Sequence, residues 1–380
     1  MSKVLHTTFT AILLLYSFIS PAQDKRAQYP ALLTNSYFGV DIGYIDYRFS
    51  QKQLEPGYTA SSVRIPHAAV SVFFGHQFNK YLSAQLSYMR PVAFVEYMNV
   101  NGGGHNYEVG MNVAGLSLKP CLPISKNVSL NGEAGIALIT RGGFIVVDRP
   151  GVKDASYAGL LLGAGLKYQL NSKWELSINS LWASSSDKLR QPSTFFASAG
   201  FNYVMRSLPK EIVAKNADTG HVFPRHSIGL AFTTSALGYG INNFVSKDAH
   251  IFWGGAARVR QGFSINYRSN LFHTRKVFSL DWGAGVAWWK SNPGNETFYT
   301  LSIYPAFRFT FARTKPLDIY FDYSFAGPSF ISRTTIEGKD MGGKFTFQDF
   351  MGIGIVAGRQ RNLEAGIRIA HYSNGNIFPQ

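Results

Sequence analysis

A histidine and a serine lie two residues apart near the end of the 380-residue chain, at His371 and Ser373. A serine hydroxyl is a weak nucleophile until an adjacent base takes its proton, and an imidazole is the commonest such base. In a β-strand, side chains two positions apart point to the same face. The pair is therefore a candidate base and nucleophile for acyl transfer, positioned by a strand.

The residues before this pair alternate between apolar and polar side chains. Apolar residues recur at every second position from Leu363 to Ile369, and the histidine and the serine continue that face. Glu364 and Arg368 lie on the opposite face. An apolar outer face and a polar inner face are typical of a barrel strand in a membrane. We therefore expect the pair to face lipid.

Similar alternating segments, each of about ten residues as a tilted membrane strand requires, fill most of the chain. In the first half they lie near residues 36–48, 66–77, 82–98, 106–119, 127–139, 157–169, 173–184 and 195–205. The second half contains seven. In a barrel of eight strands the lumen is just wide enough for side chains to fill it. We expect complementary charges there to form salt bridges, from Asp281, Arg308, Asp318, Asp322, Glu364 and Arg368.

The composition and the amino terminus indicate an envelope protein. Charged residues make up 16% of the chain, whereas about a quarter is usual for a soluble protein. An apolar run of about eleven residues follows Lys3 and ends before Ser20-Pro21-Ala22, which is the pattern of a signal peptide over residues 1–22. That run is too short to span a bilayer as a helix, so strands would have to cross the membrane.

The formal net charge of +15 is spread along the sequence. Nucleic-acid binding would require a basic cluster, so no nucleic-acid partner is expected. Dispersed basic residues are compatible with an anionic lipid surface. The nine histidines show no metal-ligand spacing, so neither a metal nor another cofactor is expected.

The two halves of the chain resemble each other at an offset of 189 residues, which aligns Glu175 with Glu364 and Ser184 with Ser373. This repeat predicts a duplicated unit. The position that matches His371 is Trp182, so the first unit lacks the candidate base.

These patterns predict an all-β protein built from two tandem, transmembrane, antiparallel β-barrels. The first barrel, residues 23–206, has eight strands. A linker over residues 207–225 contains two prolines and no alternation. The second barrel, residues 226–380, is one strand short of eight. A single barrel of about sixteen strands is the alternative, but it would need a short turn in place of the linker.

A family resemblance rests on the stretch from Lys344 to Pro379. It contains Phe345-Thr346-Phe347-Gln348-Asp349, the glycines Gly352 and Gly354, and His371-Tyr372-Ser373-Asn374. This stretch resembles the carboxy-terminal part of the PagL-type lipid A 3-O-deacylases, also called acyloxyacyl hydrolases, and the resemblance covers about residues 226–380.

The resemblance implies an eight-stranded barrel in the outer membrane of a Gram-negative bacterium. Its implied partner is lipid A of lipopolysaccharide, from which it would hydrolyse the ester-linked acyl chain at the 3 position without a metal. By the same resemblance, His371 is the general base, Ser373 is the nucleophile and Asn374 helps to form the oxyanion hole.

The family also places an acidic residue about a dozen positions beyond the serine, followed by an eighth strand. The sequence stops at Gln380, before either feature, and we expect it to be a partial sequence. If the last two strands turn around Gln360, however, Asp349 falls opposite His371 on the outward face and could orient it. The alternative function is a non-catalytic barrel, either a scaffold or a degenerate paralogue.

Overall fold

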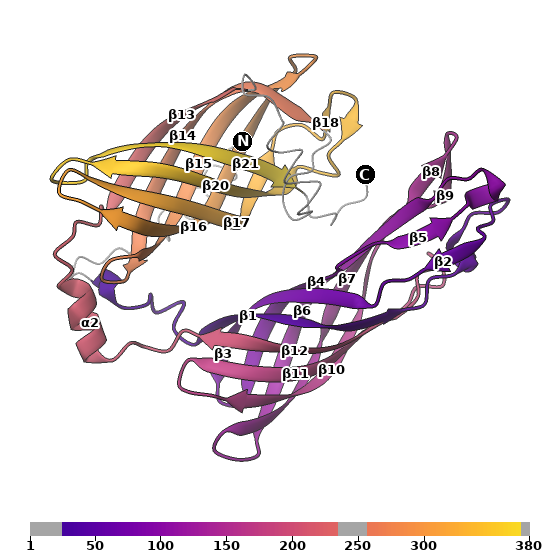
Figure 1. Ribbon diagram of the computed structural model, residues 1–380, viewed down its shortest axis with the longest axis horizontal. Coiled ribbons are helices and arrows are strands. Elements are labelled where there is room, and N and C mark those ends of the chain that lie inside the picture. The colour runs from indigo at the N-terminus through magenta and orange to yellow at the C-terminus, as the bar shows by residue number, and fades with distance from the viewer. Residues whose placement is uncertain (1–24, 235–256, 374–380) are drawn as a thin grey trace, which may run out of the picture.

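Two large antiparallel sheets, one in each half of the chain, dominate the computed structural model (Figure 1). The structure describes residues 25–234 and 257–373, so the expected signal peptide over residues 1–22 lies outside the described residues. Among those residues, no helix combines the length and the apolar character needed to cross a membrane.

The first sheet closes into an eight-stranded barrel, because its first strand pairs with both the second and the last. Large apolar side chains on its outer face remain exposed, including Ile42, Leu116, Ile136 and Ile178, as expected for a wall in contact with lipid. The barrel strands are β1 (Ser36–Tyr47), β3 (Ala68–Asn79), β4 (Leu82–Pro91), β6 (Tyr107–Pro123), β7 (Val128–Gly142), β10 (Ala155–Gln169), β11 (Trp174–Ala183) and β12 (Thr194–Val204).

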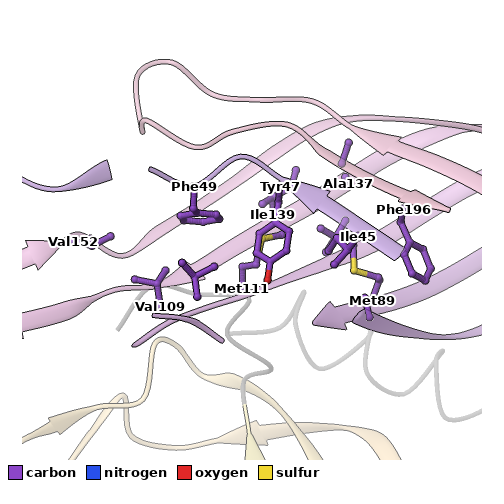
Figure 2. Close-up of a cluster of buried hydrophobic side chains, with 14 of the residues drawn as sticks. Ile45, Tyr47, Phe49, Met89, Val109, Met111, Ala137, Ile139, Val152 and Phe196 are labelled. Atoms are coloured by element: carbon purple, nitrogen blue, oxygen red, sulfur yellow. The ribbon is translucent and has the colours of Figure 1, made fainter. Parts of the chain in front are cut away.

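Additional short strands extend this barrel at the end opposite the linker. They are β2 (Ser62–Arg64), β5 (Val95–Met98), β8 (Phe144–Val146) and β9 (Arg149–Val152). A cluster of buried apolar side chains fills this end, with Ile45, Tyr47, Met111, Ile139 and Phe196 among its members (Figure 2). Deeper in the lumen, Lys119 and Glu133 form a buried ion pair at 3.0 Å.

The second sheet has seven strands in sequence order. They are β13 (His226–Thr234), β14 (Arg258–His273), β15 (Phe278–Asn292), β16 (Thr297–Arg313), β17 (Leu317–Ile331), β20 (Phe345–Ala357) and β21 (Leu363–Ser373). A small hairpin of β18 (Thr335–Ile336) and β19 (Lys339–Asp340) joins β17 to β20. Within the described residues, β13 and β21 do not pair, so both are edge strands.

A network of ion pairs fills the middle of the second unit. Arg268 lies 3.0 Å from Asp322 and also contacts Glu364, while Arg308 lies 2.8 Å from Glu364 and Arg368 lies 3.1 Å from Asp322. These pairs satisfy charges that would otherwise be costly to bury. The sequence pattern identified all of these residues except Arg268.

The other two aspartates of the predicted lumen set lie away from this network. Asp281 accepts a hydrogen bond from Asn270 at 2.7 Å. Asp318 pairs with Arg313 and Arg361 close to the linker end of the sheet. Gly352 provides room in the lumen, because a Cβ atom there would lie 2.6 Å from Oδ1 of Asp322.

The observed sheets confirm the all-β fold and the tandem arrangement. Among the described strands, none of the first sheet pairs with a strand of the second, so a single large barrel is excluded. The linker differs from expectation, because it contains the helix α2 (Lys210–Ala217). A helix of eight residues spans only about two turns, which is too short to produce a clear hydrophobic period.

The segment before β1 contacts both units and the linker. The hydroxyl groups of Tyr29 and Tyr203 lie 2.9 Å apart, and the ring of Tyr29 lies 4.6 Å from that of Phe272 in β14. The Gln28 side chain both donates to and accepts from the backbone of Leu208. These contacts tie the two sheets together at the linker end.

Candidate active site

The candidate pair lies on β21, at the edge of the second sheet (Figure 1). Strand alternation places both residues on its outward face. Leu363 and Ile367 share this face and are 66% and 70% exposed. Glu364 and Arg368 point to the opposite side and join the lumen network. His371 and Ser373 are half-buried at the end of the strand farther from the linker. The alternation expected from the sequence is therefore the one found.

Asp349 lies directly across from His371. Strands β20 and β21 turn around Gln360, and their register pairs Asp349 with His371 and Phe347 with Ser373. Oδ1 of Asp349 is 3.2 Å from Nδ1 of His371. An imidazole that donates from Nδ1 to a carboxylate presents the lone pair of Nε2 as a base. This arrangement can hold the histidine in the tautomer that nucleophilic catalysis requires.

The carboxylate of Asp349 is shielded although it belongs to an outward-facing position. The residue is only 7% exposed, and the alternate positions Phe347 and Met351 flank it on the same face. A buried carboxylate requires a partner, and His371 supplies one. Shielding from solvent also strengthens the interaction between the two groups.

Ser373 is the last residue that the structure describes in β21. It continues the face of His371, so its hydroxyl and the imidazole belong to the same side of the sheet. Asn374, which the family resemblance places in the oxyanion hole, lies outside the described residues.

Tyr372, between the two candidate residues, points into the lumen. Its hydroxyl accepts a hydrogen bond from Oγ1 of Thr300 at 3.1 Å, and Thr300 in turn accepts one from Nε1 of Trp289 at 2.8 Å. The rings of Trp289 and Tyr372 meet edge to face, with centroids 6.2 Å apart. Strands β15 and β16 therefore hold the backbone of β21 from across the lumen, at the point between base and nucleophile.

This anchor was missed by the sequence analysis. Strand periodicity places Tyr372 on the inner face, but it carries no information about which residues meet it across a lumen. Thr300 and Trp289 are also inward residues of their own strands. Tyr372, Thr300 and Trp289 meet because of the order in which the strands pair, which the sequence pattern does not reveal.

Replacing Tyr372 with phenylalanine should lower kcat for the acyl transfer that this pair is suited to by about tenfold and leave KM unchanged. The change removes the hydroxyl that Thr300 contacts and keeps the ring, and a small misplacement of reacting groups is enough for such a loss. Steady-state kinetics would measure the effect. Tyr37→Phe is a matched control, because it removes a lumen hydroxyl that bonds to Gln85 in the first barrel. An equal loss in both variants would contradict a positioning role for Tyr372.

The first barrel has no equivalent site. Trp182, which matches His371, lies on the exposed outer face of β11. Ser184 follows the end of β11, and its Oγ accepts a hydrogen bond from the backbone N–H of Leu160 at 2.9 Å. This serine therefore has a structural contact and no base beside it in the aligned position.

Two protein-family models match the chain, one in each of its two units. Residues 258–379 match the family model described as Lipid A 3-O-deacylase (PagL). Residues 33–213 match the model described as OmpA-like transmembrane domain. The resemblance drawn from the sequence is confirmed for the second unit, and the generic barrel expected for the first is confirmed as well.

Three solved structures are each similar to less than half of the chain. The N-terminal barrel domain of Pseudomonas aeruginosa OprF is 16% identical, covers 45% of this chain and 98% of its own, and gives a TM-score of 0.29. Neisserial surface protein A is 14% identical, with 45% and 97% coverage and a TM-score of 0.31. Yersinia pestis Ail is 18% identical, with 44% and 99% coverage and a TM-score of 0.26. The search of curated proteins gave no match.

Both matched families consist of outer-membrane barrels, which places this protein in the outer membrane of a Gram-negative bacterium. The closed first barrel and the strand-rich second unit agree with that location. The chain thus joins a barrel that matches the OmpA-like transmembrane domain model to a region that matches the lipid A 3-O-deacylase (PagL) model.

Proposed function

We propose that the second unit, residues 226–380, is an ester hydrolase that removes the 3-O-linked acyl chain of lipid A. The observation that carries this proposal is the pairing of Asp349 with His371 on a lipid-facing strand, two residues before Ser373, within the region that matches the deacylase family. The first unit, residues 23–206, would serve as a barrel without chemistry, joined by the linker over residues 207–225.

In the proposed reaction, Oγ of Ser373 attacks the ester carbonyl carbon while Nε2 of His371 takes its proton. The carbon–oxygen bond to the sugar then breaks, and His371 returns the proton to the departing 3-oxygen. A water molecule, deprotonated by His371, hydrolyses the acyl-serine and releases the fatty acid. Asp349 holds the imidazole and stabilises its protonated form. Asn374 is proposed to donate to the oxyanion, a contact that is typically worth about 3 to 4 kcal/mol.

The position of the pair suits a lipid substrate. His371 and Ser373 lie at the end of β21 farther from the linker, and the short turns of a barrel face the periplasm, so this end lies toward the outer leaflet. The ester of an acyl chain would then lie at Ser373. Its tail would extend toward the bilayer centre along the exposed apolar residues Ile367 and Leu363.

The composition of lipid A in cells that express the complete protein tests this proposal. We expect mass spectrometry to show lipid A that has lost one ester-linked hydroxyacyl chain, with the matching free hydroxy fatty acid in the medium or membrane. Amide-linked chains should be retained, because an amide is a harder substrate for the same groups. Unchanged lipid A, with the protein folded in the outer membrane, would instead favour the non-catalytic barrel.

A further inference from the structure

The turns at the linker end of both sheets carry basic side chains. Each of the six described turns between barrel strands at this end contains at least one lysine or arginine, and no aspartate or glutamate lies within them. Arg361, in the turn between β20 and β21, pairs with Asp318. We call the remaining basic residues of these turns the basic rim; they are Lys80, Lys126, Lys173, Arg275, Lys276, Lys315 and Arg359. All are exposed except Lys173, which is half-buried.

At the opposite end of the molecule several basic side chains are neutralised by acids, as Arg313 and Arg361 are by Asp318 at the linker end. Glu55 pairs with Lys153 at 2.8 Å and also contacts Arg190, and the hydrogen bond from Lys153 lowers the pKa of Glu55. Arg64 pairs with Glu96, and Arg333 lies 2.8 Å from Glu296. Among the described residues, none of the seven rim side chains forms a salt bridge. The turns at the linker end therefore combine seven basic side chains that form no salt bridge with a complete lack of acidic residues in the same described turns.

The basic rim borders directly on apolar wall residues. Tyr81, Trp174 and Val277 are exposed and adjoin rim residues in sequence, and Ile124 is exposed two positions before Lys126. Nζ of Lys80 lies 4.8 Å from the ring centroid of Tyr81. Aromatic residues at strand ends mark the membrane interface, and lysine and arginine side chains extend their charge from there toward the headgroups. The rim thus lies at the depth of lipid phosphates and not out in the aqueous phase.

We propose that the basic rim binds the phosphate groups of anionic phospholipids in the inner leaflet of the outer membrane. A carboxylate-rich polymer such as the cell wall would instead require basic groups that project away from the bilayer. Because both units contribute turns to the rim, lipids bound there would hold the two barrels upright in the same leaflet. This role is independent of the proposed hydrolysis at Ser373, which lies at the other end of β21.

The test measures lipid selectivity around the complete protein reconstituted in phosphatidylcholine bilayers. We expect the relative association constant of spin-labelled phosphatidylglycerol over phosphatidylcholine to be about fivefold, the effect of one basic side chain at the headgroup level. High salt should reduce this preference toward one, because ionic strength screens exposed charges. A wild-type preference near one, or a preference that salt does not change, would overturn the proposal.

Two variants of equal charge change separate the basic rim from general surface charge. The rim variant carries Lys80→Gln, Lys126→Gln, Arg275→Gln and Lys276→Gln. The control variant carries Lys52→Gln, Arg149→Gln, Lys188→Gln and Lys344→Gln, all exposed and at the opposite end. Only the rim variant should lose the preference for phosphatidylglycerol, while both retain the circular dichroism of β-sheet.

Two further outcomes would contradict the assignment. An equal loss of lipid preference in both variants would show that the position of the charges does not matter. If the rim variant kept its lipid preference but no longer bound isolated cell-wall sacculi, the partner would be the polymer. Exchanging chloride for inorganic phosphate at equal ionic strength should leave lipid selectivity unchanged, whereas a site for free phosphate would lower it.

Discussion

Alanine at position 373 is expected to lower the rate of lipid A deacylation by a factor on the order of 10⁴ to 10⁶. The substitution removes the hydroxyl that would form the acyl-enzyme, and His371 and Asp349 have no second nucleophile to activate on the same face of β21 within the described residues. Release of hydroxy fatty acid from lipid A in detergent micelles would measure the rate.

The duplicated architecture supplies a matched control for this variant. Ser184→Ala makes the same chemical change at the corresponding position of the first barrel, where the hydroxyl contacts the backbone of Leu160. Its rate should equal that of the wild type. A variant that combines His371→Ala with Ser373→Ala should be no slower than either single change, because the two groups act as one unit. Full activity of Ser373→Ala would remove this serine from the mechanism.

The strands could be predicted from the sequence because a barrel wall imposes a strong pattern. Lipid on one side and a filled lumen on the other force a period of two over each segment, so each of the predicted strands in the first barrel appears near its expected place. The short helix α2, and the small strands that extend the first barrel at the end opposite the linker, have no such constraint. The large apolar cluster at the outer end was also missed, since its residues come from loops as well as strands.

Part of the candidate site could be predicted from the sequence for the same reason. His371 and Ser373 share a face by spacing alone, and one assumption about the turn at Gln360 places Asp349 across from His371. Contacts across the lumen could not be predicted from the sequence, because they depend on which strands face each other across the barrel. Arg268, which joins the charges of Asp322 and Glu364, and the anchor on Tyr372 both belong to this class.

The acidic residue of a lipid-facing site lies next to an apolar medium. A carboxylate on the outer wall of a barrel borders hydrocarbon, so it must be paired or covered. Asp349 is both, since His371 pairs with it and the neighbouring wall leaves it only 7% exposed. In the membrane, a charge retained at such a position without a partner would be destabilising. The pairing with His371 meets this requirement, and the proposed reaction would use the same contact to orient the imidazole.

Asparagine at position 349 should reduce kcat by about 10⁴-fold, because an amide that donates to Nδ1 of His371 would fix the opposite tautomer, with the proton on Nε2. KM should stay close to that of the wild type, since Asp349 contacts His371 from the neighbouring strand and has no proposed contact with substrate. Asp340→Asn is the matched control, because its exposed side chain lies at the end of β19, where it accepts a hydrogen bond from the backbone N–H of Gly342.

Labelling with a fluorophosphonate separates this orienting role from a loss of fold. The reagent reacts with an activated serine whether or not lipid A binds, so the labelling rate of Ser373 reports directly on the imidazole beside it. Asp349→Asn should slow labelling in parallel with kcat, whereas Asp340→Asn should label as fast as the wild type. Normal labelling of Asp349→Asn would show that another group orients His371. If labelling slowed equally in both variants, the loss would reflect the stability of the second unit and not the chemistry of the pair.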